Sequence, residues 1–255
     1  MSLYIGCSGY FYRSWIGRFY PKHLKAEDFL SFYAKHFNAL EIGITRHRIL
    51  SRAKVESFIK RAKGVHFGVV AYRGFIGSYS KRELSGFLYS LEPMLEQDRL
   101  ICLVFELPVG LGFNQDSIKI IQKISKDFES FPKVLQLRHK SFRKAEFFNL
   151  ASEMGFGIVS TDGPKRGDFL LGPWLDGEIL YVRAFGKELY DYLYSIEELK
   201  KLHRRIIDVR GGKKAVFFLN FSRASAVLNA MQLCLLSGRH VRIPESLSVR
   251  ESPWE

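Results

Sequence analysis

The sequence predicts a single-domain (β/α)8 barrel of the TIM type. Three observations support this fold class. The chain has 255 residues, and α/β barrels use about 250 residues as one domain. Eight short apolar runs alternate with polar, helix-forming stretches. The runs are almost continuously apolar, as expected for parallel strands that are covered on both faces.

The predicted elements alternate regularly along the chain. Apolar, β-rich runs predict eight strands, at residues 3–6, 39–43, 65–72, 100–107, 134–137, 157–161, 179–184 and 215–220. Helical periodicity predicts seven helices, at residues 26–37, 52–63, 81–97, 116–128, 144–154, 196–208 and 224–236. Ser80 and Ser195 precede two of these helices as N-caps, and Glu198 completes a capping box with Ser195.

The unit after the sixth strand is irregular. Two Gly-Pro steps, at residues 163–164 and 172–173, oppose a long helix there, so we expect a loop or a single turn. We expect the barrel to span residues 1–237. A C-terminal tail, 238–255, would cap the barrel or contact a partner. The alternative architecture, a doubly wound open sheet, needs a G-x-G-x-x-G loop, which residues 6–9 do not form.

Composition limits the function classes. Hydrophobic residues make up 47% and charged residues 25%, which excludes disorder and coiled coil as the main state. The 39 Lys and Arg exceed the 26 Asp and Glu, for a net charge of +13. This excess favours anionic partners, namely nucleic acid, phosphorylated metabolites or a membrane surface, although a generally basic proteome would also explain it.

Compartment and membrane association follow from other features. No apolar stretch approaches the roughly 20 residues of a membrane span, so we expect no membrane insertion. The first residues show no signal-peptide pattern. The three cysteines, Cys7, Cys102 and Cys234, are far apart and lack disulfide spacing. We therefore expect a reducing, cytoplasmic environment.

Polar side chains occur at every predicted strand end. These residues are Ser8, Glu41, Arg73, Glu106, Arg138 with His139, Asp162, Arg183 and Asn220. The carboxyl ends of barrel strands meet at one face, where barrel active sites lie. We expect these residues to line a pocket there. The alternative is a network of Arg–carboxylate pairs that satisfy one another and need no ligand.

The residue types suggest roles in such a pocket. Arginine forks match phosphate and carboxylate, so Arg73, Arg138 and Arg183 would hold an anion. Glu41 and Asp162 would transfer protons, assisted by His139. The remaining predicted ligand-binding residues are Asn220, Glu106, Ser8 and Arg48.

Metal and covalent chemistry have weaker support. None of the seven histidines is spaced as a zinc ligand, so we predict no metal site. A carboxylate site for Mg²⁺ or Mn²⁺ on Glu41, Asp162 and His139 is a weaker alternative. Ser8 lacks a G-x-S-x-G elbow, and no P-loop is present. Nothing in the sequence identifies a cofactor.

Several motifs, taken together, resemble one family. Residues 6–21 read GCSGYFYRSWIGRFYP, which resembles the G-T-S-G-W-x-Y-x-x-W-x-G-x-F-Y-P opening of the domain of unknown function 72 (YecE-like) family. The similarity continues in order to about Ala230, through FNALEI at 37–42, FELP at 105–108, LRH at 137–139, YVR at 181–183, and Asn220 with Asn229-Ala230. The resemblance implies a TIM-like barrel. It implies no established activity, and the sugar-isomerase-like label sometimes given to the family rests on fold analogy.

The chain departs from the family pattern at several positions. Glu106 replaces a Gln, and Gln136 replaces a Glu two residues before the Arg of strand five. Other positions that differ are Gly43, Arg46, His47, Val70, Ile76, Gly77, Phe185 and Phe221. The charged residues persist while several expected ligand contacts have changed. The chain therefore belongs to a branch with another substrate or has lost an ancestral activity.

Three functional hypotheses follow. The first is a barrel enzyme, or former enzyme, whose Arg-rich pocket binds a small anionic or phosphorylated ligand. The second is a non-catalytic nucleic-acid-binding protein that uses its basic surface. The third is an interaction protein with a vestigial site. The aromatic residues of the opening motif favour loop packing over base stacking.

Overall fold

The computed structural model describes residues 2–164, 172–241 and 243–244. Eight strands form a closed parallel barrel in chain order, in which β8 pairs with β1. The strands are β1 (Leu3–Ser8), β2 (Ala39–Ile42), β3 (His66–Val70), β4 (Leu100–Glu106), β5 (Lys133–Gln136), β6 (Phe156–Asp162), β7 (Gly177–Ala184) and β8 (Gly211–Phe218). The predicted (β/α)8 fold class is confirmed.

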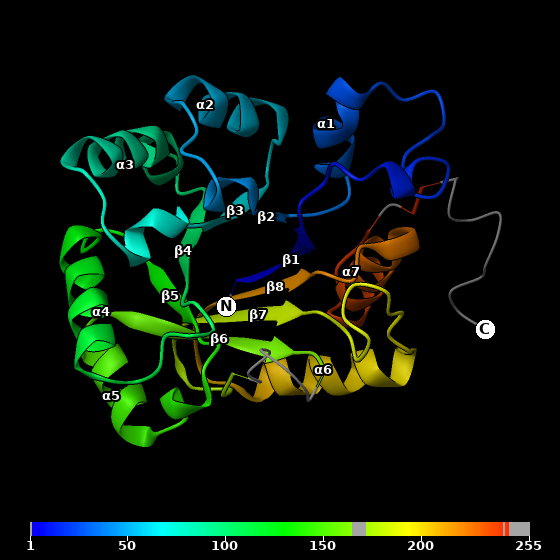
Figure 1. The fold of residues 1–255 in the computed structure, drawn as a ribbon. Coiled ribbons are helices and arrows are strands. Elements are labelled where there is room, and N and C mark those ends of the chain that lie inside the picture. Colours follow the sequence, from blue (N-terminus) through cyan, green and yellow to red (C-terminus); the bar gives the residue numbers. More distant parts are fainter. Residues whose placement is uncertain (1, 165–171, 242, 245–255) are drawn as a thin grey trace.

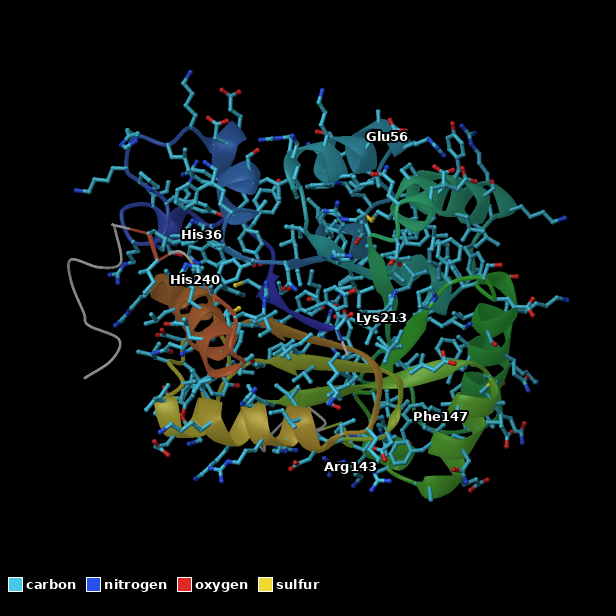
Figure 2. All side chains as sticks on the ribbon, turned by 180° about the vertical axis from the view of Figure 1, so that it is seen from behind. His36, Glu56, Arg143, Phe147, Lys213 and His240 are labelled. Atoms are coloured by element: carbon cyan, nitrogen blue, oxygen red, sulfur yellow. The ribbon has the colours of Figure 1, made fainter. Side chains whose placement is uncertain are left out.

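Helices surround the barrel and cover the outer faces of its strands (Figure 1). They are α1 (Phe29–Tyr33), α2 (Arg52–Arg61), α3 (Lys81–Glu96), α4 (Gln115–Asp127), α5 (Ala145–Glu153), α6 (Ile196–Asp208) and α7 (Ser225–Leu236). The helix predicted at 26–37 is shorter than expected, because a 3-10 turn at Ala26–Asp28 precedes α1. Figure 2 shows side chains filling the space between strands and helices.

Helices α3 and α6 begin at the N-cap serines that the sequence predicts. Ser195 and Glu198 form the predicted capping box at α6, in which the Ser195 hydroxyl accepts from the backbone N–H of Glu198. Ser80 caps α3 in the same way, with Glu83 as its partner. Each box satisfies backbone N–H groups that a helix leaves unpaired at its start.

The connection from β6 to β7 contains no helix in its described part, residues 163–164 and 172–176. The rest of the predicted irregular unit, 165–171, lies outside the described residues. Gly172 packs so closely on β6 that an added Cβ would lie 1.9 Å from the carbonyl oxygen of Val159. The hydroxyl of Ser160 donates to the carbonyl of Pro173 at 2.8 Å. These contacts hold the end of the connection against the strand.

The aromatic side chains of the opening motif pack into the fold. Trp15, Phe19 and Tyr20 are fully buried. The indole N–H of Trp15 donates to the carbonyl of Phe221, 206 residues later in the chain, at 2.9 Å. Trp15 therefore joins the first and last loops of the barrel, and the burial of all three rings agrees with loop packing.

Two residues of the predicted tail contact the barrel. Val241 is buried in the main core cluster. The Arg239 guanidinium donates to the side chain of Asn38, just before β2, at 2.7 Å. Residues 242 and 245–255 of the tail are outside the described part. No helix in the described part of the chain is long and apolar enough to cross a membrane.

Candidate functional site

A chain of hydrogen-bonded side chains crosses the interior of the barrel near the carboxyl ends of its strands. Arg183 of β7 is central. Its Nε donates to Oε2 of Glu41 on β2 at 2.8 Å, and its Nη1 donates to Oε1 of Glu106 on β4 at 2.6 Å. Only 3% of the Arg183 side chain is exposed. Burial alone would lower the pKa of Arg183, but the two carboxylates outweigh it and raise that pKa.

Glu41 is sealed beneath Arg183. Its Oε2 also accepts from the hydroxyl of Tyr181 at 2.6 Å, and its Oε1 accepts from the hydroxyl of Ser8 at 2.5 Å. The side chain is 1% exposed. A buried carboxylate needs this full set of donors, because an unpaired charge there costs several kcal/mol, on the order of 3–5. The geometry gives Glu41 and Ser8 a structural role that orients Arg183.

Glu106 lies at the outer end of this chain, where the barrel opens. Its Oε2 is 3.0 Å from Nη1 of Arg46, in the turn after β2. Burial would raise the pKa of Glu106, but Arg183, Arg46 and Arg138 lower it below its usual value. Glu106 is therefore ionised at neutral pH.

A pocket of about 360 Å³ opens above Glu106. Its lining comes from segments that follow β2, β3, β4 and β5: Arg46, Ala71, Tyr72, Arg73, Gly74, Ile76, Phe105, Glu106, Leu107, Pro108 and Arg138. Three of these side chains are guanidinium groups and one is a carboxylate. Because Glu106 is already bonded to Arg183, the pocket carries an excess of positive charge.

Two predicted site residues point away from the barrel interior. Successive side chains of a strand face opposite sides. Thr161 faces inward, where its hydroxyl lies 3.1 Å from the side-chain nitrogen of Gln136, so its neighbour Asp162 faces the helices. Asp162 accepts from the hydroxyl of Tyr194 at 3.0 Å, and its other oxygen is 3.8 Å from Arg205 of α6. Burial raises the pKa of Asp162, and these two groups offset part of that effect.

Asn220 is the second such residue. Its side-chain nitrogen donates to Asn229 of α7 at 2.8 Å and to the carbonyl of Tyr192 at 2.7 Å. Asn220 therefore joins the loop before α6 to α7 and does not line the pocket.

His139 and Arg48 also lie apart from the pocket lining. The ring of His139 contacts the hydroxyl of Ser141 at 2.7 Å and caps the 3-10 turn that follows β5. Arg48 is exposed, two residues beyond Arg46, which lines the pocket instead. The structure does not bring the three predicted catalytic side chains together: Glu41 is inside the barrel, Asp162 faces α6, and His139 caps its own turn.

The sequence reasoning missed several members of the site. Arg46, Tyr181, Gln136 and Thr161 were not predicted as site residues. Strand alternation could have identified the last three, because each lies two residues from, or opposite, another inward-facing polar side chain. Nothing local distinguishes Arg46 from Arg48, since the turn that aims Arg46 at Glu106 is formed by the fold.

Glu106 and Gln136, the two residues that differ from the family pattern on β4 and β5, both lie close to one atom of Arg183. Nη1 of Arg183 lies 2.6 Å from Oε1 of Glu106 and 3.4 Å from Oε1 of Gln136. Both residues are therefore within reach of the same guanidinium group. The family motifs that this chain resembles have Gln at the position of Glu106 and Glu at the position of Gln136, so this chain carries the two residues in reverse order. The two positions together hold one carboxylate in either arrangement.

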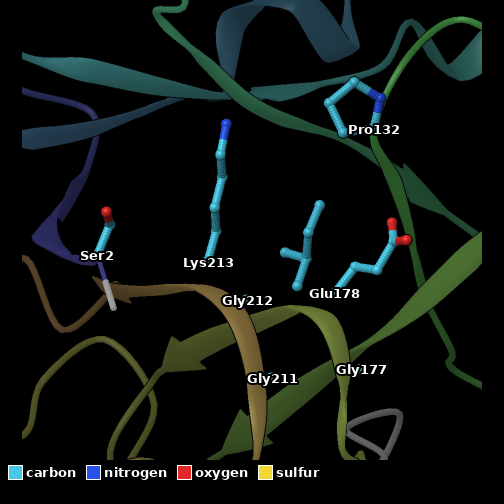
Figure 3. Close-up of a pocket in the computed structure, with 8 residues that line it drawn as sticks. Ser2, Pro132, Gly177, Glu178, Gly211, Gly212 and Lys213 are labelled. Atoms are coloured by element: carbon cyan, nitrogen blue, oxygen red, sulfur yellow. The ribbon is translucent and has the colours of Figure 1, made fainter.

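A larger hollow, of about 860 Å³, lies at the opposite end of the barrel, where β7 and β8 begin (Figure 3). Three of its lining residues are glycines, and its charged groups are Glu178 and Lys213. Lys213 lies 3.3 Å from Asp98. This is the amino-terminal face of the barrel, which in this fold serves stability. The polar groups of the site lie at the other face.

Among the described residues, no side chains are arranged for metal binding or for catalysis by a thiol. No three His, Cys, Asp or Glu side chains among them are grouped around a possible metal position. All three cysteines are buried. Burial raises the pKa of Cys7, which lowers its reactivity as a nucleophile.

Comparison with solved structures finds closely similar folds. A DUF72 family protein from Thermotoga maritima MSB8 is 24% identical, with a TM-score of 0.85 over 94% of this chain and 100% of that chain. A DUF72 family protein from Enterococcus faecalis V583 is 18% identical, with a TM-score of 0.82 over 94% and 97% of the two chains. A xylose isomerase domain containing protein from Salmonella typhimurium LT2 is 14% identical, with a TM-score of 0.53 over 92% and 94%.

No curated protein matches the sequence. These three structural neighbours are less than 25% identical and therefore show the fold of the chain, a TIM barrel, without its activity. The sequence itself matches a family over residues 4–253, which is nearly its whole length. The chain belongs to the family described as Protein of unknown function DUF72.

Proposed function

We propose that this protein binds a small phosphate- or carboxylate-bearing ligand in the pocket above Glu106. One observation carries the proposal: three arginines line a pocket in which the one carboxylate among the described lining residues is already bonded to a fourth arginine. Guanidinium groups recognise phosphate and carboxylate through paired hydrogen bonds. A volume of about 360 Å³ accommodates a small metabolite.

The four arginines have different roles in this proposal. Arg73 is exposed and Arg138 half-buried, so their guanidinium groups are accessible to a ligand in the pocket. Arg46 is 38% exposed and adds a third cation. Arg183 is committed to Glu41 and Glu106, so it supports the floor of the pocket and does not bind the anion itself.

The pocket is better equipped for binding than for strong-base catalysis. The lowered pKa of Glu106 makes this carboxylate a weak base. Glu41, the other interior carboxylate, is covered by Arg183. Any reaction in the pocket would therefore depend on positioning and on stabilising negative charge, to which the arginines are suited.

A thermal-shift screen with sugar phosphates, polyol phosphates, carboxylates and short oligonucleotides tests this function. A ligand at 100 times its Kd should stabilise the protein by about 2.7 kcal/mol, a shift of several degrees for a chain of this size. Arg73→Ala and Arg138→Ala should abolish the shift. Arg48→Ala is the matched control, because Arg48 is an exposed arginine outside the pocket lining, and it should leave the shift intact.

Two outcomes would overturn the proposal. One is the lack of a shift with every small anion. The other is a salt-sensitive shift with oligonucleotides that neither pocket variant reduces, which would favour the basic exterior as the binding surface.

A further inference from the structure

We infer that the ligand of this pocket carries a hydrogen-bond donor, a hydroxyl or amino group, beside its anionic group, and that Glu106 selects for it. This inference rests on the proposed function and names the class of ligand more closely. It excludes simple anions that present only acceptor oxygens. The preferred class is that of hydroxylated phosphates or carboxylates, such as polyol and sugar phosphates.

The two oxygens of Glu106 have unequal partners. Oε1 accepts a hydrogen bond from Arg183 at 2.6 Å. Oε2 is a buried atom and accepts no hydrogen bond from the described residues. Arg46 is near, with its Nη1 at 3.0 Å, but this contact is an ion pair without hydrogen-bond geometry. The side chain of Glu106 is nine-tenths buried, so bulk water does not readily replace the missing donor.

A buried acceptor without a donor is costly in proteins and usually has an explanation. Here Glu106 belongs to the lining of the candidate pocket, and Oε2 lies just beneath the Arg46 guanidinium, among groups that are mainly donors. Arg46, Arg73 and Arg138 carry donors and no side-chain acceptor. A ligand complementary to this lining presents acceptor oxygens to the arginines and one donor to Glu106.

Arg46 is placed to allow this exchange. Its side chain is 38% exposed and comes from a single 3-10 turn, Ile44–Arg46, so its guanidinium can shift without disturbing a strand. When a ligand donor approaches Oε2, Arg46 can move from Glu106 onto the anionic group. The excess positive charge of the pocket would then face the anion while Glu106 accepts from the donor.

A matched pair of probes tests the inference. Glycerol 3-phosphate and propyl phosphate share a phosphate group and a three-carbon chain, but only the first has carbon-bound hydroxyls. Titration calorimetry should give glycerol 3-phosphate a Kd lower by about tenfold or more, the effect of one hydrogen bond to a charged acceptor.

Glu106→Gln should remove this preference. Arg183 has only donors, so it keeps the amide oxygen at the position of Oε1 and leaves the amide NH₂ at the position of Oε2. An acceptor thereby becomes a donor, and the ratio of the two Kd values should fall to about one. Glu56→Gln, at an exposed carboxylate of α2, is the control and should keep the wild-type ratio.

Arg46→Gln gives a second test in which Glu106 stays ionised. This variant should weaken the binding of both probes and preserve the ratio between them. Equal affinity of the two probes for the wild type, or an unchanged ratio in Glu106→Gln, would overturn the inference while leaving the anion pocket supported. Failure of both probes to bind, together with the lack of a thermal shift with every small anion of the screen, would instead contradict the proposed function itself.

Discussion

Moving the carboxylate from position 106 on β4 to position 136 on β5 tests whether Arg183 can pair with a carboxylate at either position. Glu106→Gln removes a carboxylate from Arg183, leaving Glu41 as its partner, and should lower the free energy of unfolding by about 1–3 kcal/mol. Gln136→Glu alone adds a carboxylate at a side chain that is 5% exposed, and should cost about 3 kcal/mol.

The double variant Glu106→Gln/Gln136→Glu restores the number of carboxylates. The carboxylate introduced on β5 would lie about where the Gln136 oxygen now lies, 3.4 Å from Nη1 of Arg183, close enough to form the ion pair after a small shift. We expect the double variant to be more stable than the sum of the single variants predicts by about 2 kcal/mol, the coupling typical of neighbours in one network. That difference corresponds to about 4–8 °C in Tm.

Urea denaturation at neutral pH measures the free energy of unfolding of the wild type, the two single variants and the double variant. The control pairs Glu106→Gln with Gln115→Glu, which restores the net charge at an exposed position at the start of α4. This control should show no coupling. Additive losses in the cycle of positions 106 and 136 would refute the reasoning, because they would mean that Arg183 does not bind the two positions as alternatives.

Three further predictions follow from the same geometry. Arg183→Met should lower the free energy of unfolding by about 3–5 kcal/mol, since it leaves buried Glu41 without its cation and Glu106 with Arg46 alone. A loss below about 1 kcal/mol by denaturant titration would contradict the network. The lowered pKa of Glu106 means that its contribution to stability is present above its unfolded-state pKa and is lost as the pH falls through its folded-state pKa. The wild type should therefore lose more stability than Glu106→Gln as the pH falls below about 5, and parallel pH profiles would argue against this. Cys7, buried and with a raised pKa, should react with a thiol reagent only on unfolding, and rapid labelling of the native protein at this residue would show that it is accessible.

The fold and the candidate site differ in how far the sequence predicts them. Eight apolar runs and the length of the chain were sufficient for the barrel, because a parallel sheet covered on both faces needs such runs and little else. The capping box at Ser195 was also predictable, since it depends on residues three apart. Site residues were harder. The strand-end rule identified Glu41, Glu106, Arg138 and Arg183, which do surround the interior.

The rule failed to orient residues near the ends of strands. Asp162 and Asn220 were expected in the barrel mouth, but they face α6 and α7. A shift of one residue along a strand reverses the direction of the side chain, and strand boundaries are the least certain part of a sequence-based prediction. The local sequence therefore does not separate an inward Thr161 from an outward Asp162.

The sequence by itself determined the barrel, its order of strands and the presence of arginines and carboxylates at one of its faces. Hydrophobic periodicity and short local motifs carry that information. Tertiary structure decided which arginines remain available. Arg183 is consumed by Glu41 and Glu106, on strands that lie 142 and 77 residues away in the chain, while Arg46 is delivered to the pocket by a turn. These pairings depend on closure of the barrel, which brings distant strands within hydrogen-bond distance, and no local pattern encodes them.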